Sequence, residues 1–97
     1  MAQIVYSARS LANLQRAFDF LRGKSPAAAA AAAIAIRTAV EALALHPLIG
    51  RRIEGDLREL VISYGDSGYI AVYRYLVASD EVRILAIRHQ REIGYVP

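Results

Sequence analysis

Hydrophobic residues recur along this chain with two different periods, and the change of period separates helices from strands. Residues 3–6 form a short β-branched and aromatic run, which is typical of a strand. Ser7 is a good N-cap residue. After it, leucines and a phenylalanine recur at helical spacing, and arginines occupy the other faces of the predicted helix. This pattern predicts an amphipathic helix that ends at Gly23, where a left-handed glycine can close it.

A second helix is predicted from Ser25 to His46. Serine is its N-cap and Pro26 its first residue, a position where the missing N–H costs nothing. The alanine run of residues 27–33 forms helix readily, and its small side chains let a neighbouring helix approach closely. The two helices are therefore expected to pair as an antiparallel hairpin. Pro47 stops the second one, because the residue before a proline is pushed out of the helical region.

The rest of the chain has the composition of strands and turns. Residues 48–57 are predicted to form a loop, since they contain two glycines and several charged side chains. Three strands follow at residues 58–63, 68–77 and 82–91, separated by turn residues, and a short irregular tail ends the chain. The last strand is apolar at nearly every position from Ile84 to Ile87, which predicts a central strand covered on both faces.

These elements have the order β-α-α-β-β-β within one domain, residues 1–97. Consecutive strands joined by short turns become antiparallel neighbours, and a helical hairpin can cover one face of such a sheet. The sequence therefore predicts a two-layer α+β fold in which a helical hairpin packs on an antiparallel sheet. The uncovered face of the sheet is expected to be a groove with basic residues on its rim.

Composition excludes several classes of protein. The chain is 56% hydrophobic and 22% charged, which is typical of a globular domain. It has no cysteine, so disulfides, thiolate catalysis and cysteine-bound zinc are excluded. We expect a cytoplasmic protein, because no basic segment followed by an apolar core begins the chain. Residues 26–45 are apolar, yet their alanines and the charges of Arg37 and Glu41 indicate a soluble helix instead of a membrane span.

The charge balance is mildly basic, with a formal net charge of +3 and a pI of about 9.6. Such a balance is compatible with an anionic partner, either nucleic acid or an acidic protein segment. Eleven of the twelve basic residues are arginine, which suits bidentate pairing with carboxylate or phosphate. The codon composition of a GC-rich genome would explain the arginines equally well.

Two histidines are the main candidates for chemistry. His46 lies beside a helix-ending proline and is most simply a capping residue. His89 lies at the end of the last strand between Arg88 and Arg91, whose charges disfavour its protonated form. A neutral imidazole there can act as a general base, or it can be a structural residue that bonds the backbone. Neither a placed nucleophile nor an acidic pair with metal-site spacing is found, so arginine, histidine and tyrosine remain. Such a set can cleave RNA without a metal, or bind an acidic partner.

Several segments together carry a resemblance to a known family, although each is weak alone. They are the opening strand with residues 7–11 (SARSL), residues 45–47 (LHP) with 50–51 (GR), residues 58–61 (RELV), residues 68–69 (GY) with 72–74 (VYR), and residues 82–89 (VRILAIRH). In this order and spacing, nearly the whole chain resembles the RelE/ParE superfamily of bacterial type II toxin–antitoxin toxins. These growth-inhibiting proteins are associated with plasmid stabilization. The resemblance implies a helical hairpin on an antiparallel sheet, with the first strand beside the last.

The resemblance implies one of two main activities. RelE-like members are ribosome-dependent, metal-independent endoribonucleases that cleave mRNA in the ribosomal A site. They have a basic residue or histidine at the end of the last strand and a tyrosine a few residues later, and His89 and Tyr95 match these positions. Under this reading Arg88 and Arg91 flank the catalytic histidine.

Two further features of the RelE-like branch are missing here. That branch has basic residues on the strand that corresponds to residues 58–63, and an arginine where Ile70 follows Tyr69 in this chain. Replacing a charged catalytic group by an aliphatic one typically forfeits on the order of several kcal/mol of barrier lowering. ParE-like members also lack these groups and inhibit DNA gyrase, so the ParE-like reading is favoured over a ribonuclease. A third reading is an inactive relative that serves as an antitoxin sink.

Both branches bind an antitoxin whose C-terminal segment wraps the toxin and whose N-terminal part binds DNA as a dimer. The resemblance therefore implies a ParD-like partner that folds on the helical hairpin and the open sheet face, and it implies no cofactor and no metal. The side chains expected to bind the antitoxin or the target are Arg51, Arg52, Arg58, Arg74, Arg88, His89 and Arg91.

Overall fold

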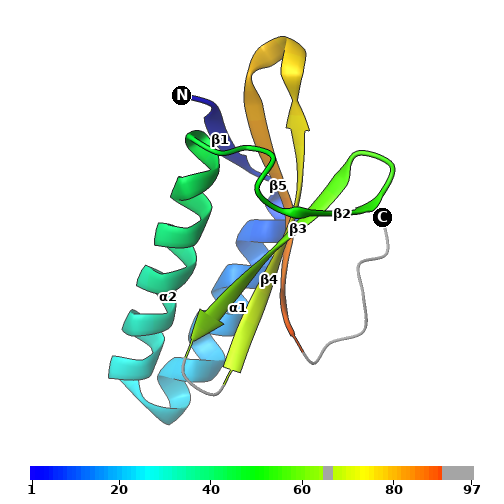
Figure 1. Ribbon diagram of the computed structural model, residues 1–97. Helices are drawn as coiled ribbons and strands as arrows, with labels where there is room; N and C mark the ends of the chain where they lie inside the picture. The colour runs from blue at the N-terminus through cyan, green and yellow to red at the C-terminus, as the bar shows by residue number, and fades with distance from the viewer. Residues whose placement is uncertain (65–66, 91–97) are drawn as a thin grey trace.

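The computed structural model describes residues 1–64 and 67–90. Two helices lie along one face of a twisted five-stranded sheet, giving a two-layer α+β fold (Figure 1). The elements in chain order are β1 (Gln3–Tyr6), α1 (Ala8–Lys24), α2 (Pro26–Glu41), the 3₁₀ turn η1 (Ala42–Ala44), β2 (Arg51–Glu54), β3 (Leu57–Tyr64), β4 (Ser67–Leu76), the 3₁₀ turn η2 (Val77–Ser79) and β5 (Glu81–His89).

The helical hairpin forms as predicted, with one correction at its bend. The Ser7 hydroxyl accepts a 3.0 Å hydrogen bond from the Ser10 N–H, and the Ser25 hydroxyl accepts one of 3.2 Å from the Ala28 N–H. Gly23 does not end α1, which continues to Lys24. Ser25 ends it instead, because its extended backbone (φ −160°, ψ 116°) breaks the helix while its own N–H still donates to the Leu21 carbonyl. One serine thus closes α1 and caps α2.

The strand order is β1-β5-β4-β3-β2, and the sheet is mixed. The antiparallel prediction holds for the two predicted pairs, β3–β4 and β4–β5, but β1 runs parallel to β5, with Gln3 opposite Glu81. No short turn joins β1 to β5, so the two strands can pair parallel or antiparallel. The turn residues in the sequence therefore do not predict the direction of this pairing. The last strand is internal, as predicted, although β4 and not β5 occupies the centre.

The predicted loop of residues 48–57 contains an additional strand. Arg51–Glu54 forms β2 and pairs antiparallel with β3 across a turn in which Gly55 has a left-handed backbone (φ +55°). All four β2 residues are exposed, so they lack the apolar alternation by which strands are found in sequence. In the β4–β5 connection, Asp80 adopts a left-handed backbone (φ 48°), and its carboxylate accepts a 2.7 Å hydrogen bond from the Tyr75 hydroxyl.

The main core lies between the sheet and the helices. It gathers Ile36, Val40 and Leu43 from the α2–η1 segment against Tyr73, Val82 and Ile84 of the sheet. A smaller cluster of Leu57, Ile70, Val72 and Ala86 lies on the opposite face. Strand β5 therefore buries side chains on both of its faces, as its apolar run predicts.

The segment Pro26–Ala44 is long and apolar enough to cross a membrane by length and composition alone, with a mean hydropathy of 1.6. Core helices pass the same test, and here Ala29, Ala32, Ile36 and Val40 are buried within the fold. In this structure α2 is therefore a core helix.

Candidate functional site

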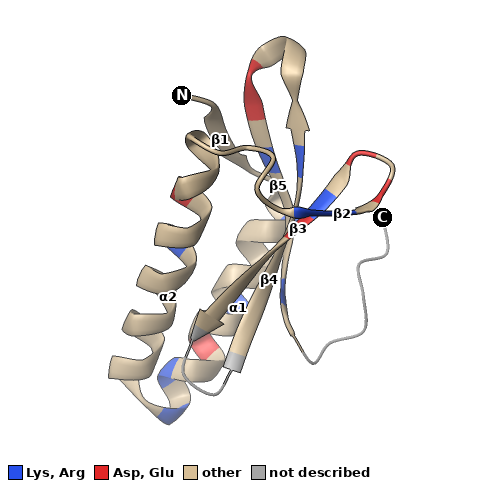
Figure 2. Ribbon diagram, viewed as in Figure 1, with Lys and Arg blue, Asp and Glu red and all other residues tan. Residues whose placement is uncertain are grey.

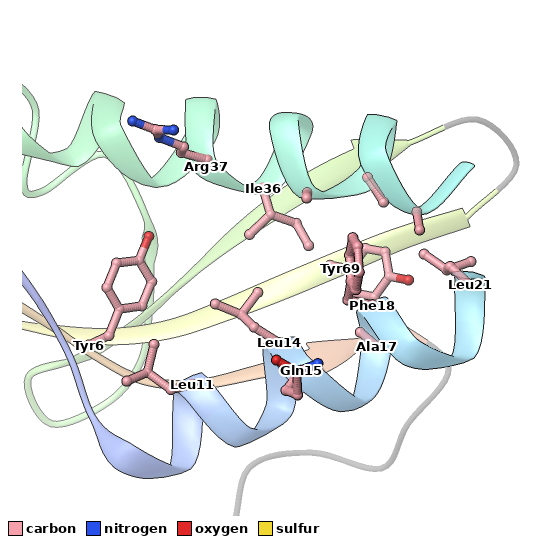
Figure 3. Close-up of a pocket in the computed structure, with 13 residues that line it drawn as sticks. Tyr6, Leu11, Leu14, Gln15, Ala17, Phe18, Leu21, Ile36, Arg37 and Tyr69 are labelled. Carbon is pink, nitrogen blue, oxygen red and sulfur yellow. The ribbon is translucent and has the colours of Figure 1, made fainter. Parts of the chain in front are cut away.

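An apolar groove runs between the two helices. It has a volume of about 350 Å³, with walls formed by both helices and Tyr69 of β4 between them (Figure 3). The groove exists because α2 presents small side chains to it, including Ala29, Ala32 and Ala33, where larger residues would fill the space. Its lining is almost wholly apolar, so it suits the apolar face of a partner segment.

One end of this groove is marked by Tyr6 and Arg37. The Arg37 guanidinium forms an exposed 2.9 Å ion pair with Glu41 one turn later. Burial is the main cause that raises the pKa of Tyr6, and the nearby Glu41 carboxylate raises it further. A second hollow, of about 560 Å³, shares Tyr6 and Arg37 and continues to β1 and the N-terminus. The two hollows form one continuous apolar track with a charged pair midway.

His89 lies on the same face of the sheet as the helices. Its ring meets that of Tyr69 edge to face, with centroids 5.5 Å apart and an interplanar angle of 83°. Both rings line a cavity of about 400 Å³ against α1, together with Asn13, Arg16, Ala17, Phe20, Leu21, Lys24 and Ile87. The Asn13 side-chain oxygen accepts a 3.0 Å bond from the Ile87 N–H and so attaches α1 to β5. The two cations in this lining were missed in the sequence, since only the fold brings α1 beside the end of β5.

Arg88 lies on the opposite, open face. It stands across from Ile70 in the register, and its guanidinium lies 3.6 Å from the Glu59 carboxylate. Arg51 of β2 also pairs with Glu59, which is only 8% exposed. The carboxylate of Glu59 therefore lies between two of the predicted binding arginines. Which carboxylate they share depends on the strand register, so it was not predicted from the sequence.

The remaining predicted arginines also contact their own chain. Arg74 pairs with Asp56 at 2.9 Å. Arg58 donates to the Leu48 and Gly50 carbonyls at 3.1 and 2.8 Å, and Arg52 donates twice to the Gly55 carbonyl. Basic and acidic positions consequently intermingle on the β2–β3 hairpin and the strands beside it (Figure 2).

The structure does not gather the predicted residues into one site. Arg51 and Arg88 meet through Glu59, Arg74 is paired separately, and His89 lies across the sheet from all three. Arg91 and Tyr95 fall outside the described residues. Within residues 1–64 and 67–90, no three histidine or acidic side chains are placed to hold a metal ion.

Comparison with known proteins places these features in a family. Residues 4–94 match the family described as "ParE toxin of type II toxin-antitoxin system, parDE". The chain is 42% identical to Toxin RelE2 of Caulobacter vibrioides over 89 residues, covering 92% of this chain and 96% of that protein. It is 40% identical to Toxin RelE3 of the same organism, covering 87% of this chain and 86% of that protein.

The fold has a solved counterpart as well. A chain of the structure named "Chromosomal ParDE TA system from P. aeruginosa" superimposes with a TM-score of 0.74 at 22% identity, covering 92% of this chain and 96% of that one. That likeness concerns the fold, and the family match extends over nearly the whole sequence. This chain belongs to the ParE toxin family of type II toxin–antitoxin systems, within the RelE/ParE superfamily, and membership of that family implies a cognate antitoxin.

Proposed function

We propose that this toxin arrests growth by inhibiting DNA gyrase, acting in the cytoplasm without a cofactor. The observation that carries the proposal is the separation of Arg88 and His89 onto opposite faces of the sheet. A ribonuclease needs cationic groups beside its general base, because electrostatic stabilisation of the developing phosphate charge is usually the largest catalytic contribution. Arg88, the cation next to His89 in sequence, instead pairs with Glu59.

At the strand positions where the RelE-like branch has cations, this chain has aliphatic residues. Ile70 occupies the β4 position where the RelE-like branch has an arginine, and its side chain is buried in the small cluster on the open face. On β3, Leu60 and Ile62 face the helices and pack in or against the main core. A gyrase inhibitor requires none of these charges, since it acts by binding and not by stabilising a phosphate transition state.

We further propose that a ParD-like antitoxin neutralises this toxin by folding along the groove between α1 and α2. The groove is mostly apolar and about 350 Å³ in volume, and Leu11 in its lining is 53% exposed. A disordered amphipathic segment can bury its apolar side chains there. An acidic residue of that segment would meet Arg37 at the end of the groove.

The alternative function is RelE-like cleavage of mRNA, and two observations favour it. Both curated relatives carry the name RelE. Arg16 and Lys24 line the same cavity as His89, so cations are present on that face, although the Lys24 ammonium stands 4.6 Å from the Phe20 ring centroid as a cation–π contact. For this function, Arg16 and Lys24 of α1 would have to replace the catalytic cations that RelE-like members have on their strands.

Two assays separate these functions. Purified toxin should block supercoiling of relaxed plasmid by DNA gyrase, and an equimolar amount of antitoxin should restore it. Mapping of mRNA 5′ ends in induced cells should reveal no new cuts within codons. Ribosome-dependent cuts without an effect on gyrase would establish the ribonuclease, and absence of growth arrest on induction would leave the inactive antitoxin sink.

A further inference from the structure

Apolar side chains project from the loop between η1 and β2. We define the apolar crest as Leu45, Pro47, Leu48 and Ile49. Leu45, Leu48 and Ile49 are 66%, 57% and 60% exposed, and Pro47 is half-buried. The crest borders a shallow hollow that His46, Pro47, Leu48 and Ile49 line. Large aliphatic side chains gathered on a surface and left in water commonly mark an interaction site.

The backbone beneath the crest is held in place on several sides. The Gly50 N–H donates a 2.8 Å hydrogen bond to the buried hydroxyl of Tyr73, and Arg58 binds the carbonyls on either side of Ile49. The Ile49 N–H closes a turn onto the His46 carbonyl at 3.1 Å. Apolar side chains on such an anchored backbone lose little further backbone entropy on binding, which favours recognition of a folded surface.

Two exposed arginines, Arg51 and Arg52, follow the crest closely in the chain. Arg51 keeps 77% of its side chain exposed although it pairs with Glu59. A complementary surface would therefore offer an apolar recess edged by carboxylates.

The crest is separate from the groove between the helices. None of its residues lines that groove, its continuation toward β1, or the cavity that contains His89. Substituting these four side chains therefore removes no contact from an antitoxin segment bound between α1 and α2.

We propose that the apolar crest is the surface by which this toxin contacts its protein target, at an apolar recess edged by carboxylates. The inference rests on the proposed function, which requires a protein target. Aliphatic side chains provide no stacking partner for nucleic acid bases, so the crest fits a protein and not RNA. Because the crest is pre-ordered, it fits a folded surface better than a disordered antitoxin segment, which adapts to its site as it folds.

The test compares a double variant, L48S/I49S, with the control V77S. Val77 is 76% exposed at the β4–β5 turn and lies outside the crest, so its substitution removes a comparable exposed aliphatic side chain. Each protein is measured for growth arrest on induction, for inhibition of purified DNA gyrase, for capture by the cognate antitoxin, and for mass in solution. The expected result is that L48S/I49S needs about tenfold more protein to inhibit gyrase and loses growth arrest, since truncating central interface residues commonly costs that much. V77S should match the parent in both assays, and all three should bind antitoxin equally.

Several results would overturn this assignment. Unchanged inhibition by L48S/I49S removes the crest from the target interface. Loss of antitoxin capture, or conversion of a dimer to a monomer with intact inhibition, assigns the crest to another partner. If L48S/I49S unfolds at a lower temperature than the parent, L45S replaces it with the same expected outcome. If the parent protein arrests growth without inhibiting gyrase, the proposed function is refuted but the crest proposal is not. Comparing growth arrest by L48S/I49S and by V77S then still tests whether the crest contacts the target.

Discussion

Arg88 and His89 are adjacent in sequence and lie on opposite faces of the sheet, one beside Glu59 and the other against Tyr69. This placement follows from the period of a β-strand, in which successive side chains alternate between the two faces. The two residues therefore serve different surfaces. His89 belongs to the helix side, where the groove between the helices and the α1 cavity are found, and Arg88 belongs to an ion cluster on the open side.

Glu59 is expected to stabilise the open face. Its carboxylate is nearly buried and lies beside Arg88, whose side chain is 16% exposed, so Glu59→Gln removes a negative charge from beside a largely buried guanidinium. We predict a loss of about 1–3 kcal/mol in the free energy of unfolding, measured by urea titration. Most of the loss comes from Arg88, because the exposed partner Arg51 is screened by solvent.

The matched control for that substitution is Glu41→Gln. It removes the exposed Arg37–Glu41 ion pair on α2 and should change the free energy of unfolding by less than about 0.5 kcal/mol. Equal effects of the two substitutions would show that the Glu59 cluster is an ordinary surface ion pair.

Tyr73 is predicted to be a structural anchor. Its buried hydroxyl accepts the Gly50 N–H, so Tyr73→Phe leaves that donor unpaired and should cost about 1–3 kcal/mol in urea unfolding at neutral pH. Tyr75→Phe is the control, since it removes an exposed hydroxyl bond to Asp80. A Tyr73→Phe protein as stable as the parent would exclude this hydrogen bond as a support of the loop.

Stability is also predicted to fall in alkaline solution. Burial raises the pKa of Tyr73 above its ordinary value of 10.0, and the pKa values of Tyr6 and Tyr75 are raised as well. A group with a higher pKa in the folded state keeps its proton longer there, so its stabilisation is complete below pH 10 and is lost as the pH rises further. The urea midpoint should decline above about pH 10, and less steeply for Tyr73→Phe. An identical decline in both proteins would contradict this assignment.

The groove between the helices gives a prediction about neutralisation. Ala33→Gln places a larger polar side chain in the groove, whereas Ala30→Gln adds the same group at an exposed position that does not line it. We expect Ala33→Gln to weaken antitoxin binding about tenfold in a titration, while growth arrest persists. Antitoxin should no longer rescue cells that express the Ala33→Gln toxin. Equal binding by the two variants would place the antitoxin elsewhere.

Local signals in the sequence predicted much of the fold. Ser7 and Ser25 are caps in the structure because capping depends on the residue type and its next few neighbours. Strand β2 was missed because its residues are all exposed. The parallel pairing of β1 was missed because it depends on a partner strand 78 residues away in the sequence. The ion pairs of Glu59 depend on the same long-range register, so sequence reasoning identified the arginines but not the carboxylate that two of them share.

The central claim, that His89 is not the base of a ribonuclease, is tested most directly by mapping mRNA ends in cells that express the parent or His89→Ala. Losing the edge-to-face contact with Tyr69 should lower stability by about 0.5–1.5 kcal/mol and leave growth arrest largely intact. The account predicts that neither protein produces cuts within codons. Cuts that appear with the parent and vanish with His89→Ala would contradict it and establish the ribonuclease.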